Sequence, residues 1–424
     1  MRVLRIGVDD TDSPNGMCTT YVGAVLERKL LEMGCEKIDY SHLVRLNPNC
    51  PFKTRGNAAV SLHIKTSEDN VDKVVKTVVE TVEAFYEKGY ENTQPGIVIY
   101  EGVEIPDEWR RFAEKAVVDI VSLREALDLT EKYTAMVYMF NGGRGVIGAL
   151  AAVALPLEHY TFEAIAYRVR ENWGTVRRID PASVQELYLS GLSFDSYDPE
   201  KKEIRVTPHT PCPVLAGVRA TSAEKALKGL SMLRFFEEVA MQTVYKTNQA
   251  TDMHYVKVKL SELRPFINAV VEVRVLNVPE MKRGGHVFFE VGDDTGLVTC
   301  AAYAPTGKLR NAALALRPGD VVTVMGAVKP KPQGLTLNIE KLEVKQLITV
   351  TIKRPPQCPN CHRRMESAGK NQGYRCRRCD ISLPKEAAET IILPRGVSPG
   401  VYEVAISARR HLSMPLSLST CFQV

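Results

Sequence analysis

The sequence predicts a multidomain fold, with α/β and α+β parts in its N-terminal half, an OB-type barrel after them, and a zinc ribbon near the C-terminus. The first observation is length: 424 residues are too many for one ordinary core and predict about three or four domains. The second is a change near residue 266 from mixed helices and strands to short strands separated by turns. The third is a pair of CxxC motifs within a basic segment.

The N-terminal half begins with a strand, an acidic loop and a helix. Residues 2–8 alternate apolar with polar or small side chains, as a strand does. From Met17 to Met33 apolar residues recur at helical spacing, and Gly34 predicts the end of that helix. Further strands are predicted at 42–46, near Val60 and at 97–100, and further helices at 69–89, 107–131, 146–154 and 223–229.

The segment after residue 266 has the strand order of an OB fold. Its predicted strands are 269–276, 286–291, 297–302, 321–327 and 336–345. A helical segment near 306–316 falls between the third and fourth strands, as in OB folds. SH3-like barrels share the strand spacing, so that alternative stays open at this point.

Composition excludes several classes of protein. No apolar run approaches the ~20 residues that a membrane helix needs. The N-terminus lacks the long apolar core of a signal peptide. Six of the ten cysteines are scattered singly, which favours a reducing compartment over an extracellular disulfide framework. We therefore expect a cytoplasmic protein that has no membrane partner.

The two CxxC pairs predict a structural zinc site. Fourteen residues separate the pairs, and such knuckles can place four thiolates tetrahedrally around Zn²⁺. Four buried free cysteines would be the alternative, but chance rarely gives two knuckles amid basic residues. The expected metal ligands are Cys358, Cys361, Cys376 and Cys379.

Basic residues surround this predicted zinc site. Residues 351–379 hold eight lysines and arginines and only one acid, Glu366. Such a cluster is typical of phosphate contacts, although a solvated surface is the other interpretation. The neighbouring barrel favours nucleic acid, because OB folds commonly bind single strands. The residues expected to contact RNA are Arg363, Arg364, Lys370, Arg375, Arg377 and Arg378.

Three aspartates at the end of the first strand predict a site for Mg²⁺ and a triphosphate. Asp9, Asp10 and Asp12 lie within four residues and repel one another unless a cation lies among them. The alternative is an Asx-rich turn that caps the next helix. Thr19 and Thr20 near the start of that helix favour the phosphate interpretation, because helix N-termini bind anions.

Other loops carry residue types that suit a phosphate. Glycine lets the backbone approach a ligand closely, and cationic side chains reach its oxygens. No Walker A sequence occurs, so a nucleotide would bind by another route. The expected ATP or phosphate contacts are Lys53, Arg55, Gly143, Arg144 and Gly145.

Two polar segments, 207–213 and 247–254, are predicted to line a substrate site. The first is rich in proline and cannot be regular structure. A lone histidine in such a segment is more often structural than catalytic. The candidate lining residues are His209, Thr210, Cys212, Asp252 and His254.

Several motifs together resemble those of a known family. The runs GVDDTDSPNGMCTTY, KTRGNAAV, GRGVIGALAAV, TPHTPCPVLAGVR and TNQATDMH are similar to segments of the archaeal agmatinylcytidine synthetase family. The resemblance covers nearly the whole chain. The OB and ribbon segments are shared with many proteins, whereas DDTD followed by GMCTTY is specific to this family.

The resemblance implies an ATP-dependent ligase. It implies phosphorylation of C2 of the wobble cytidine in an isoleucine tRNA, followed by replacement with agmatine, and it implies AMP, pyrophosphate and phosphate as products. Asp9, Asp10 and Asp12 match an acidic Mg²⁺ and ATP cluster, and Thr19 matches a threonine that becomes phosphorylated. We therefore expect ATP, agmatine and tRNA as partners, with Mg²⁺ and structural Zn²⁺ as cofactors.

The resemblance also implies a kinase-like catalytic region with a ferredoxin-like portion. The expected domains are a catalytic region at 1–200, a ferredoxin-like and agmatine-site region at 201–262, an OB fold at 263–348, a zinc ribbon at 349–395 and a tail at 396–424. The rival hypothesis is a non-catalytic nucleic-acid-binding protein that uses the barrel and ribbon, with a nucleotide-sensing N-terminal half.

Overall fold

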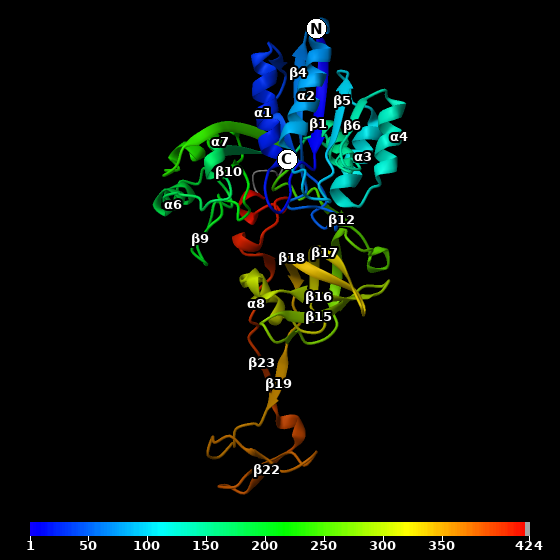
Figure 1. Ribbon diagram of the computed structural model, residues 1–424. Coiled ribbons are helices and arrows are strands. Elements are labelled where there is room, and N and C mark those ends of the chain that lie inside the picture. The colour runs from blue at the N-terminus through cyan, green and yellow to red at the C-terminus, as the bar shows by residue number, and fades with distance from the viewer. Residues whose placement is uncertain (420–424) are drawn as a thin grey trace.

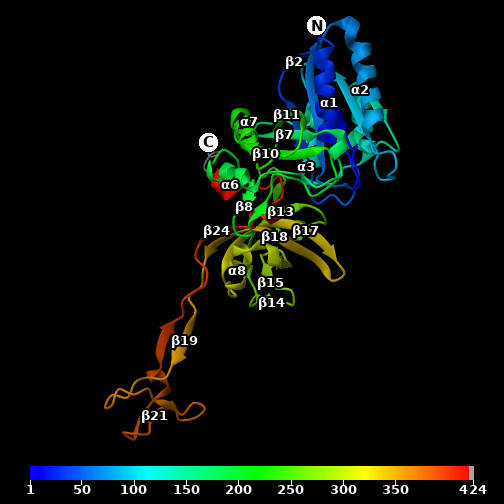
Figure 2. The same ribbon diagram turned by 60° about the vertical axis from the view of Figure 1, so that its left-hand side comes forward.

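The computed structural model describes residues 1–419, which form a large sheet domain, a barrel and a small ribbon (Figure 1). The barrel lies below the sheet domain, and the ribbon hangs from the barrel on a two-stranded stalk. Viewed after a 60° turn, the molecule is elongated, with the ribbon far from the sheet (Figure 2). The multidomain α/β and α+β prediction is confirmed.

One nine-stranded sheet spans the N-terminal half. Its order is β10-β7-β11-β3-β4-β1-β5-β6, with β2 paired to β4. Neighbouring strands are antiparallel except β3 and β11, which are parallel. The bounds are β1 Arg2–Asp9, β2 Glu36–Lys37, β3 Ser41–Arg45, β4 Ala58–Thr66, β5 Gly96–Glu101, β6 Met136–Met139, β7 Thr161–Arg168, β10 Val214–Ala220 and β11 Val239–Thr247.

Helices cover both faces of this sheet. α1 (Thr19–Glu32) and α2 (Val71–Phe85) share a core with one face, and α3 (Asp107–Val118), α4 (Leu123–Lys132) and α5 (Val146–Ala154) share a core with the other. α6 (Pro181–Leu189) and α7 (Ala223–Met232) cover the β7–β10 end, beside a small pair formed by β8 (Tyr197–Asp198) and β9 (Glu203–Ile204).

The backbone of helix α5 lies in direct contact with the sheet. This contact places the N-terminus of α5 beside the end of β1. A Cβ added at Gly7 of β1 would lie 2.1 Å from the carbonyl oxygen of Ala149. One added at Gly96 of β5 would lie 1.9 Å from the amide nitrogen of Val146. Only glycine permits such contact. The small-residue run from Gly145 to Ala154 therefore packs directly on β1 and β5.

The predicted helix at 107–131 is wrong in one respect, because the structure breaks it into α3 and α4. Asp119 leaves the helical path and binds Arg264 at 2.6 Å, which ties this corner to the start of the barrel. The Ser122 hydroxyl then accepts a hydrogen bond from the Glu125 amide at 3.1 Å and caps α4.

The barrel has the five-stranded OB arrangement. β13 pairs with both β17 and β15, and β16 pairs in parallel with β18, so the sheet closes. α8 (Lys308–Leu314) lies between β16 and β17, as predicted. The remaining bounds are β12 Tyr255–Lys257, β13 Asn268–Val275, β14 Glu280–Met281, β15 Val287–Gly292, β16 Leu297–Ala302, β17 Val321–Lys331 and β18 Gly334–Gln346.

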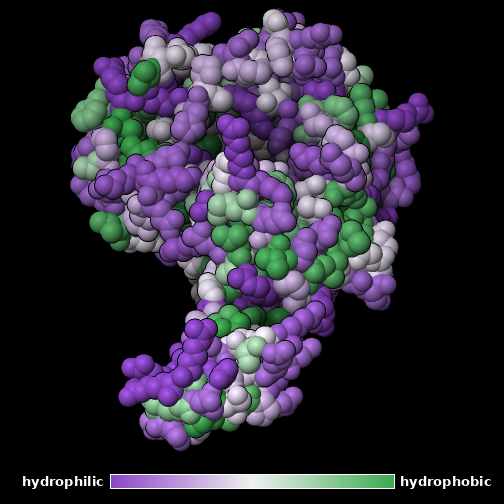
Figure 3. Space-filling view, turned by 90° about the horizontal axis from the view of Figure 1, so that it is seen from below, coloured by the Kyte–Doolittle hydropathy of each residue, from purple (hydrophilic) through white to green (hydrophobic). Residues whose placement is uncertain are grey.

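The ribbon joins the barrel through a stalk made of β19 (Thr351–Arg354) and β23 (Glu389–Ile392). Its tip is a three-stranded sheet of β20 (Glu366–Ser367), β21 (Tyr374–Cys376) and β22 (Ile381–Leu383). Seen from below, the ribbon projects from the molecule with many hydrophilic residues on its surface (Figure 3).

The tail beyond residue 395 returns to the body of the molecule. β24 (Gly400–Glu403) adds to the barrel strand β18. The following residues, red in Figure 1, run between the barrel and the sheet domain. There the His411 carbonyl accepts a hydrogen bond from the Ala250 amide at 2.8 Å. The expected domain bounds stay predictions.

Candidate active site

A cavity of about 740 Å³ opens at the C-terminal ends of β1 and β3, beside β7 and β10. Its walls come from the acidic loop, the start of α1, the loop after β3, the N-terminus of α5, strands β7 and β10, and the tail. The predicted residues that line it are Asp9, Asp10, Asp12, Thr19, Lys53, Arg55, Arg144, Gly145, His209, Thr210 and Cys212.

Three carboxylates form one corner of this cavity. Asp9 ends β1, and its carboxylate accepts a hydrogen bond from the Asp10 amide at 2.7 Å. A Cβ at Gly148 of α5 would lie 1.9 Å from Asp9 Oδ2, so the helix leaves room for this group. Asp10 has a φ of 59°, a left-handed conformation that aspartate tolerates, and it turns the chain so that Asp12 also faces the cavity.

Burial and mutual repulsion act on this acidic corner. Burial raises the pKa of Asp9 well above its usual value, and the charge of Asp10 adds to the effect. Burial also raises the pKa of Asp10 and of Asp12, although Arg144 and Arg55 respectively oppose it. Asp9 has no ion pair within residues 1–419. The three carboxylates lie close together, with too few cationic side chains to balance their charge. Their oxygen atoms are of the kind that Mg²⁺ prefers as ligands.

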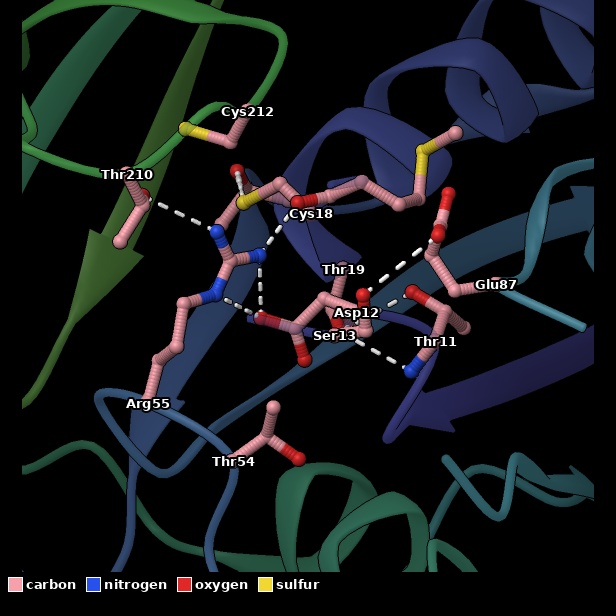
Figure 4. A network of polar contacts seen from close by, with 12 residues as sticks. Thr11, Asp12, Ser13, Cys18, Thr19, Thr54, Arg55, Glu87, Thr210 and Cys212 are labelled. Atoms are coloured by element: carbon pink, nitrogen blue, oxygen red, sulfur yellow. Dashed lines mark hydrogen bonds and ion pairs between the residues drawn. The ribbon is translucent and has the colours of Figure 1, made fainter. Parts of the chain in front are cut away.

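Arg55 connects the acidic corner to the loop before β10 (Figure 4). Its guanidinium forms an ion pair with Asp12 and donates to Thr210 Oγ1 at 3.0 Å. Arg177 stabilises that same loop, because it donates to the carbonyl oxygens of Pro208, Thr210, Cys212 and Val214.

Thr19 is the first residue of α1 and faces the acidic loop. Its hydroxyl accepts a hydrogen bond from Thr11 Oγ1 at 3.1 Å. Its side chain is nearly buried in protein yet borders the cavity. The position matches the expectation that this helix begins beside the acids.

The remaining predicted phosphate contacts divide into two groups. Arg144 binds Asp10 Oδ2 at 3.3 Å, and Gly145 lies at the cavity, whereas Gly143 packs against Met139 and does not line it. Lys53 borders the cavity on the barrel side. Burial, with Arg410 and Lys329, lowers the pKa of Lys53 to about 8.

Two predicted lining residues lie elsewhere. Asp252 forms an ion pair with Lys341 of the barrel and accepts from the Met414 amide at 2.7 Å. His254 is fully buried, 3.6 Å from Glu340 of β18. The segment 247–254 runs from the sheet to the barrel, so its second half serves this joint and does not reach the cavity.

The first half of that segment positions cavity residues instead. Asn248 accepts from the Arg45 amide at 2.7 Å and donates to the Arg45 carbonyl at 2.9 Å. Gln249 donates to Glu163 Oε2 at 2.6 Å. Asn248 and Gln249 are completely buried. They thus position Arg45 and Glu163, two residues of the cavity wall that the sequence motifs did not identify.

Sequence reasoning missed several residues of the cavity wall, among them Arg45, Glu163, Arg219 and His411. Arg219 and Glu163 face each other across β10 and β7. Arg219 is the last residue of the TPHTPCPVLAGVR motif, which was a usable signal. The other three are isolated charged or polar residues in the sequence, and only the folded sheet and tail bring them together.

The ribbon gathers its four cysteines. The Sγ atoms of Cys358, Cys361, Cys376 and Cys379 lie within 4.8 Å of one another. The Cys361 and Cys376 sulfurs are 3.6 Å apart, close to the ~3.8 Å edge that four Zn–S bonds of ~2.3 Å produce. The donor set therefore fits a tetrahedral Zn²⁺.

The basic residues of the ribbon are not equally available to a ligand. Arg364, Arg375 and Arg377 form ion pairs with Glu389, Asp380 and Glu366, respectively. In the described chain Arg363, Lys370 and Arg378 are exposed and form no ion pair. Among the six basic residues predicted to contact RNA, these three are the ones without an ion pair in the described chain. No helix in residues 1–419 combines the length and apolar character needed to cross a membrane.

Comparison with known proteins agrees with this architecture. Family models match as the TiaS TCKD domain over residues 5–142, the TiaS FLD domain over 143–254, an OB-fold nucleic acid binding domain over 269–345 and the TiaS C-terminal zinc ribbon domain over 355–397.

Relatives match over almost the full length. The tRNA 2-agmatinylcytidine synthetase TiaS of Pyrococcus horikoshii, whose name specifies an isoleucine tRNA, is 44% identical, with 98% of this chain and 97% of the relative covered. A crystal structure of TiaS in complex with such a tRNA and ATP superposes with a TM-score of 0.89 at 38% identity, and that of a complex with the tRNA, AMPCPP and agmatine with 0.85 at 36%. Each covers 98% of this chain and 97% of the other. The chain belongs to the tRNA 2-agmatinylcytidine synthetase family.

Proposed function

We propose that this chain is an ATP-dependent tRNA-modifying ligase that joins agmatine to C2 of the wobble cytidine of an isoleucine tRNA, giving 2-agmatinylcytidine. One observation carries the proposal: a single cavity brings the three carboxylates, the start of α1 and the loop 207–212 together. A nucleotide, an extruded pyrimidine and an amine all need access to one space for this reaction. A cytoplasmic location stays a prediction, supported by the RNA substrate.

In this proposal the triphosphate of ATP lies at the acidic corner. Asp9, Asp10 and Asp12 would hold Mg²⁺, which would neutralise charge on the transferring phosphoryl group. Arg55 and Arg144 are each held beside one of these carboxylates, and the N–H groups that these contacts leave unused would donate to phosphate oxygens. Catalysis would rest mainly on positioning and charge.

The chemistry proceeds in two substitutions. The C2 oxygen of cytosine attacks the γ-phosphorus of ATP, the bond to the bridging oxygen breaks, and ADP leaves. The agmatine amine then attacks C2, the C2–O bond breaks, phosphate departs with the original oxygen, and the amine loses a proton. Because one ATP carries three phosphoryl groups, AMP, pyrophosphate and phosphate cannot all arise from it. If ADP is cleaved further by water, the products are AMP and two phosphates.

Thr19 is proposed to act as a phosphoryl acceptor or a contact to the phosphoryl group in this sequence. Replacing Thr19 with alanine removes the hydroxyl and should lower turnover about a hundredfold or more, which radiolabelled agmatine incorporation would measure. Thr19→Ser keeps the hydroxyl and should retain most activity. Equal losses in both variants would assign Thr19 to packing only.

The agmatine and cytidine would lie along the loop before β10. Thr210 and Cys212 border the cavity there, and exposed His209 lies at its rim. Asp252 is already paired with Lys341, so the carboxylate that balances agmatine must come from the wall, where Glu163 is the candidate. The barrel and the zinc ribbon would hold the tRNA outside the cavity.

The decisive experiment combines the purified protein with isoleucine tRNA, ATP and agmatine, followed by mass analysis of the nucleosides. We expect 2-agmatinylcytidine at the wobble position and at least one equivalent of consumed ATP per modification. A non-catalytic RNA-binding protein would bind the tRNA and leave its nucleosides unchanged. That outcome would overturn the proposal.

A further inference from the structure

Two arginines of the cavity wall are mostly buried, and within residues 1–419 their side chains have no hydrogen-bond acceptor. Arg45 ends β3 and Arg219 lies on β10, and each side chain is only 13% exposed. The nearest carboxylate oxygens are those of Glu163, 3.9 Å from Arg45, and Asp195, 3.8 Å from Arg219. In the described chain Arg45 Nε is buried and has no hydrogen-bond partner.

Such an arrangement is costly in the absence of a ligand. A guanidinium carries five N–H donors, and a buried charge whose donors are unsatisfied destabilises a fold. Burial lowers the pKa of Arg45, and Glu163 only partly opposes this. The nearby carboxylate is also shared, because Gln249 donates to Glu163 at 2.6 Å. The protein thus keeps two cationic groups incompletely compensated at one wall.

Surrounding residues hold this wall in place. Asn248 fixes the Arg45 backbone with two hydrogen bonds. Gly217 leaves room for Glu163, since a Cβ there would lie 2.7 Å from its carboxylate. His411 of the tail completes the wall, and Arg45, together with burial, holds the pKa of its imidazole well below the usual range. A neutral imidazole can still donate a hydrogen bond.

These observations point to an anion with several acceptor oxygens. The acidic corner, with its own cations Arg55 and Arg144, is the better place for a triphosphate. A nucleotide extruded into the cavity brings its flanking phosphates with it. Arginine is the side chain best suited to several phosphate oxygens at once.

We propose that Arg45 and Arg219 form a phosphate subsite that binds the phosphodiester group beside the target cytidine. This rests on the proposed function, because it requires RNA in the cavity. The subsite would fix the depth to which the nucleotide enters, and so place C2 against the acidic corner. Free phosphate or pyrophosphate offers the same chemistry and must be distinguished by experiment.

The test uses the full-length protein and anticodon stem-loop RNAs of isoleucine tRNA, some with a neutral methylphosphonate in place of one phosphate next to the target cytidine. Arg45→Met and Arg219→Met should each weaken binding of the unmodified RNA about tenfold and reduce the salt slope by about one. For the wild type, the methylphosphonate should cause a similar loss. For the variants it should cause little further loss.

Three controls separate the alternatives. Arg205→Met is the matched variant, because Arg205 lines the same cavity but is already paired with Glu203 at 2.6 Å, so its effect should be smaller. ATP affinity should stay unchanged in all three variants. Thermal stability of the ligand-free Arg45→Met protein should be equal to or higher than that of the wild type, because a poorly compensated buried charge has been removed.

The outcomes are distinct. A wild type that binds the methylphosphonate RNA as tightly as the unmodified RNA would overturn the subsite without the need for any variant. If the variants lose affinity for inorganic pyrophosphate but not for RNA, the RNA phosphate subsite is overturned. The two arginines would then bind an inorganic phosphate product. RNA binding could also respond to the methylphosphonate and to the variants as expected while no agmatine is incorporated. That result would support the phosphate subsite and contradict the proposed ligase activity.

Discussion

At the residue scale, the acidic corner shows that the site is built at the expense of stability. Asp9 is desolvated, lies next to Asp10 and has no cation partner in the part of the chain described. A helix with glycine at position 148 is packed so that the carboxylate fits. Residues kept in an unfavourable environment by their surroundings are typical of functional sites.

Asp9→Asn should therefore stabilise the Mg²⁺-free protein and abolish its reaction. Since the folded pKa of Asp9 lies above the usual 3.8, the folded state binds more protons than the unfolded state between these values. Wild-type stability thus falls as pH rises through that range, and asparagine removes the penalty. Melting temperatures from pH 4 to 8 should diverge in favour of the variant as pH rises.

Added Mg²⁺ should remove much of that difference by stabilising only the wild type. Agmatine incorporation by the variant should fall at least about a hundredfold. A variant that is less stable than the wild type at pH 7.5 without metal would show that Asp9 instead supports the fold.

At the element scale, the loop 207–213 has no regular structure, and the Arg177 side chain makes several hydrogen bonds to its backbone. Arg177 donates to four carbonyl groups in this loop or next to it, at distances between 2.7 and 3.1 Å. The same loop offers Thr210 to Arg55, so the order of the loop bears on the acidic corner. The geometry of the cavity can thus depend on a residue that does not line it.

Arg177→Met should loosen this loop and raise KM for RNA and agmatine, with kcat/KM lower by about ten- to a hundredfold. The adjacent Arg178 is exposed, and Arg178→Met is the matched control that should leave both constants unchanged. Steady-state kinetics with each substrate varied would measure the effect. An unchanged KM in Arg177→Met would show that the loop keeps its conformation without Arg177.

At the scale of the whole molecule, the tail joins the barrel to the sheet domain. Arg410 binds Glu340 of β18 at 3.1 Å and donates to Asn49 of the sheet domain at 2.6 Å. Asn49 in turn donates to the carbonyl of Ile267, the residue before β13. Removing residues 396–424 would therefore disrupt the catalytic half as well as the barrel.

Glu340→Gln should weaken this joint. Burial alone would raise the pKa of Glu340, but Arg410 and His254 lower it to about 2, against 4.5 for a free glutamate. Its contribution to stability, about 3 kcal/mol, is present above pH 4.5 and is lost as pH falls toward 2. Denaturant unfolding should separate wild type and variant at pH 7, and the difference should disappear in acid.

The zinc ribbon can be removed without disturbing the tail. Arg354 and Glu389 face each other at the tip of the stalk, so an Asn-Gly turn can replace residues 355–388. The expected result is weaker tRNA binding with a smaller salt slope, while agmatine and ATP binding persist. Filter binding at several salt concentrations would measure it.

Replacing Arg363, Lys370 and Arg378 with alanine should reproduce most of that loss while zinc stays bound. Among the predicted RNA contacts of the ribbon, these are the cations that form no ion pair in the described residues. The slope of log affinity against log salt should decrease by about one for each lost phosphate contact. An unchanged slope in both proteins would exclude the ribbon from RNA binding.

The sequence by itself predicted many of the elements and the local motifs, but it did not predict β6, β7, α6 or β11. The strand–acid–helix opening, the five barrel strands and the cysteine knuckles each follow from spacing along the chain, because periodicity and ligand geometry are local properties. It also placed Arg55 and Arg144 in loops that border the cavity, and Thr19 near the start of the helix beside the acids. It could not show that Asp252 and His254 belong to a joint, since that depends on which distant strand packs beside them.

Only the tertiary structure decided how the cavity is completed. Arg45, Glu163 and Arg219 come from strands that are distant in sequence but close in the same sheet, and His411 arrives from the returning tail. Side chains that are brought together by the order of the strands and by the returning tail leave no periodic pattern in the sequence. The electrostatic character of the wall formed by these residues is therefore a property of the fold, because burial sets the energetic cost of its charges.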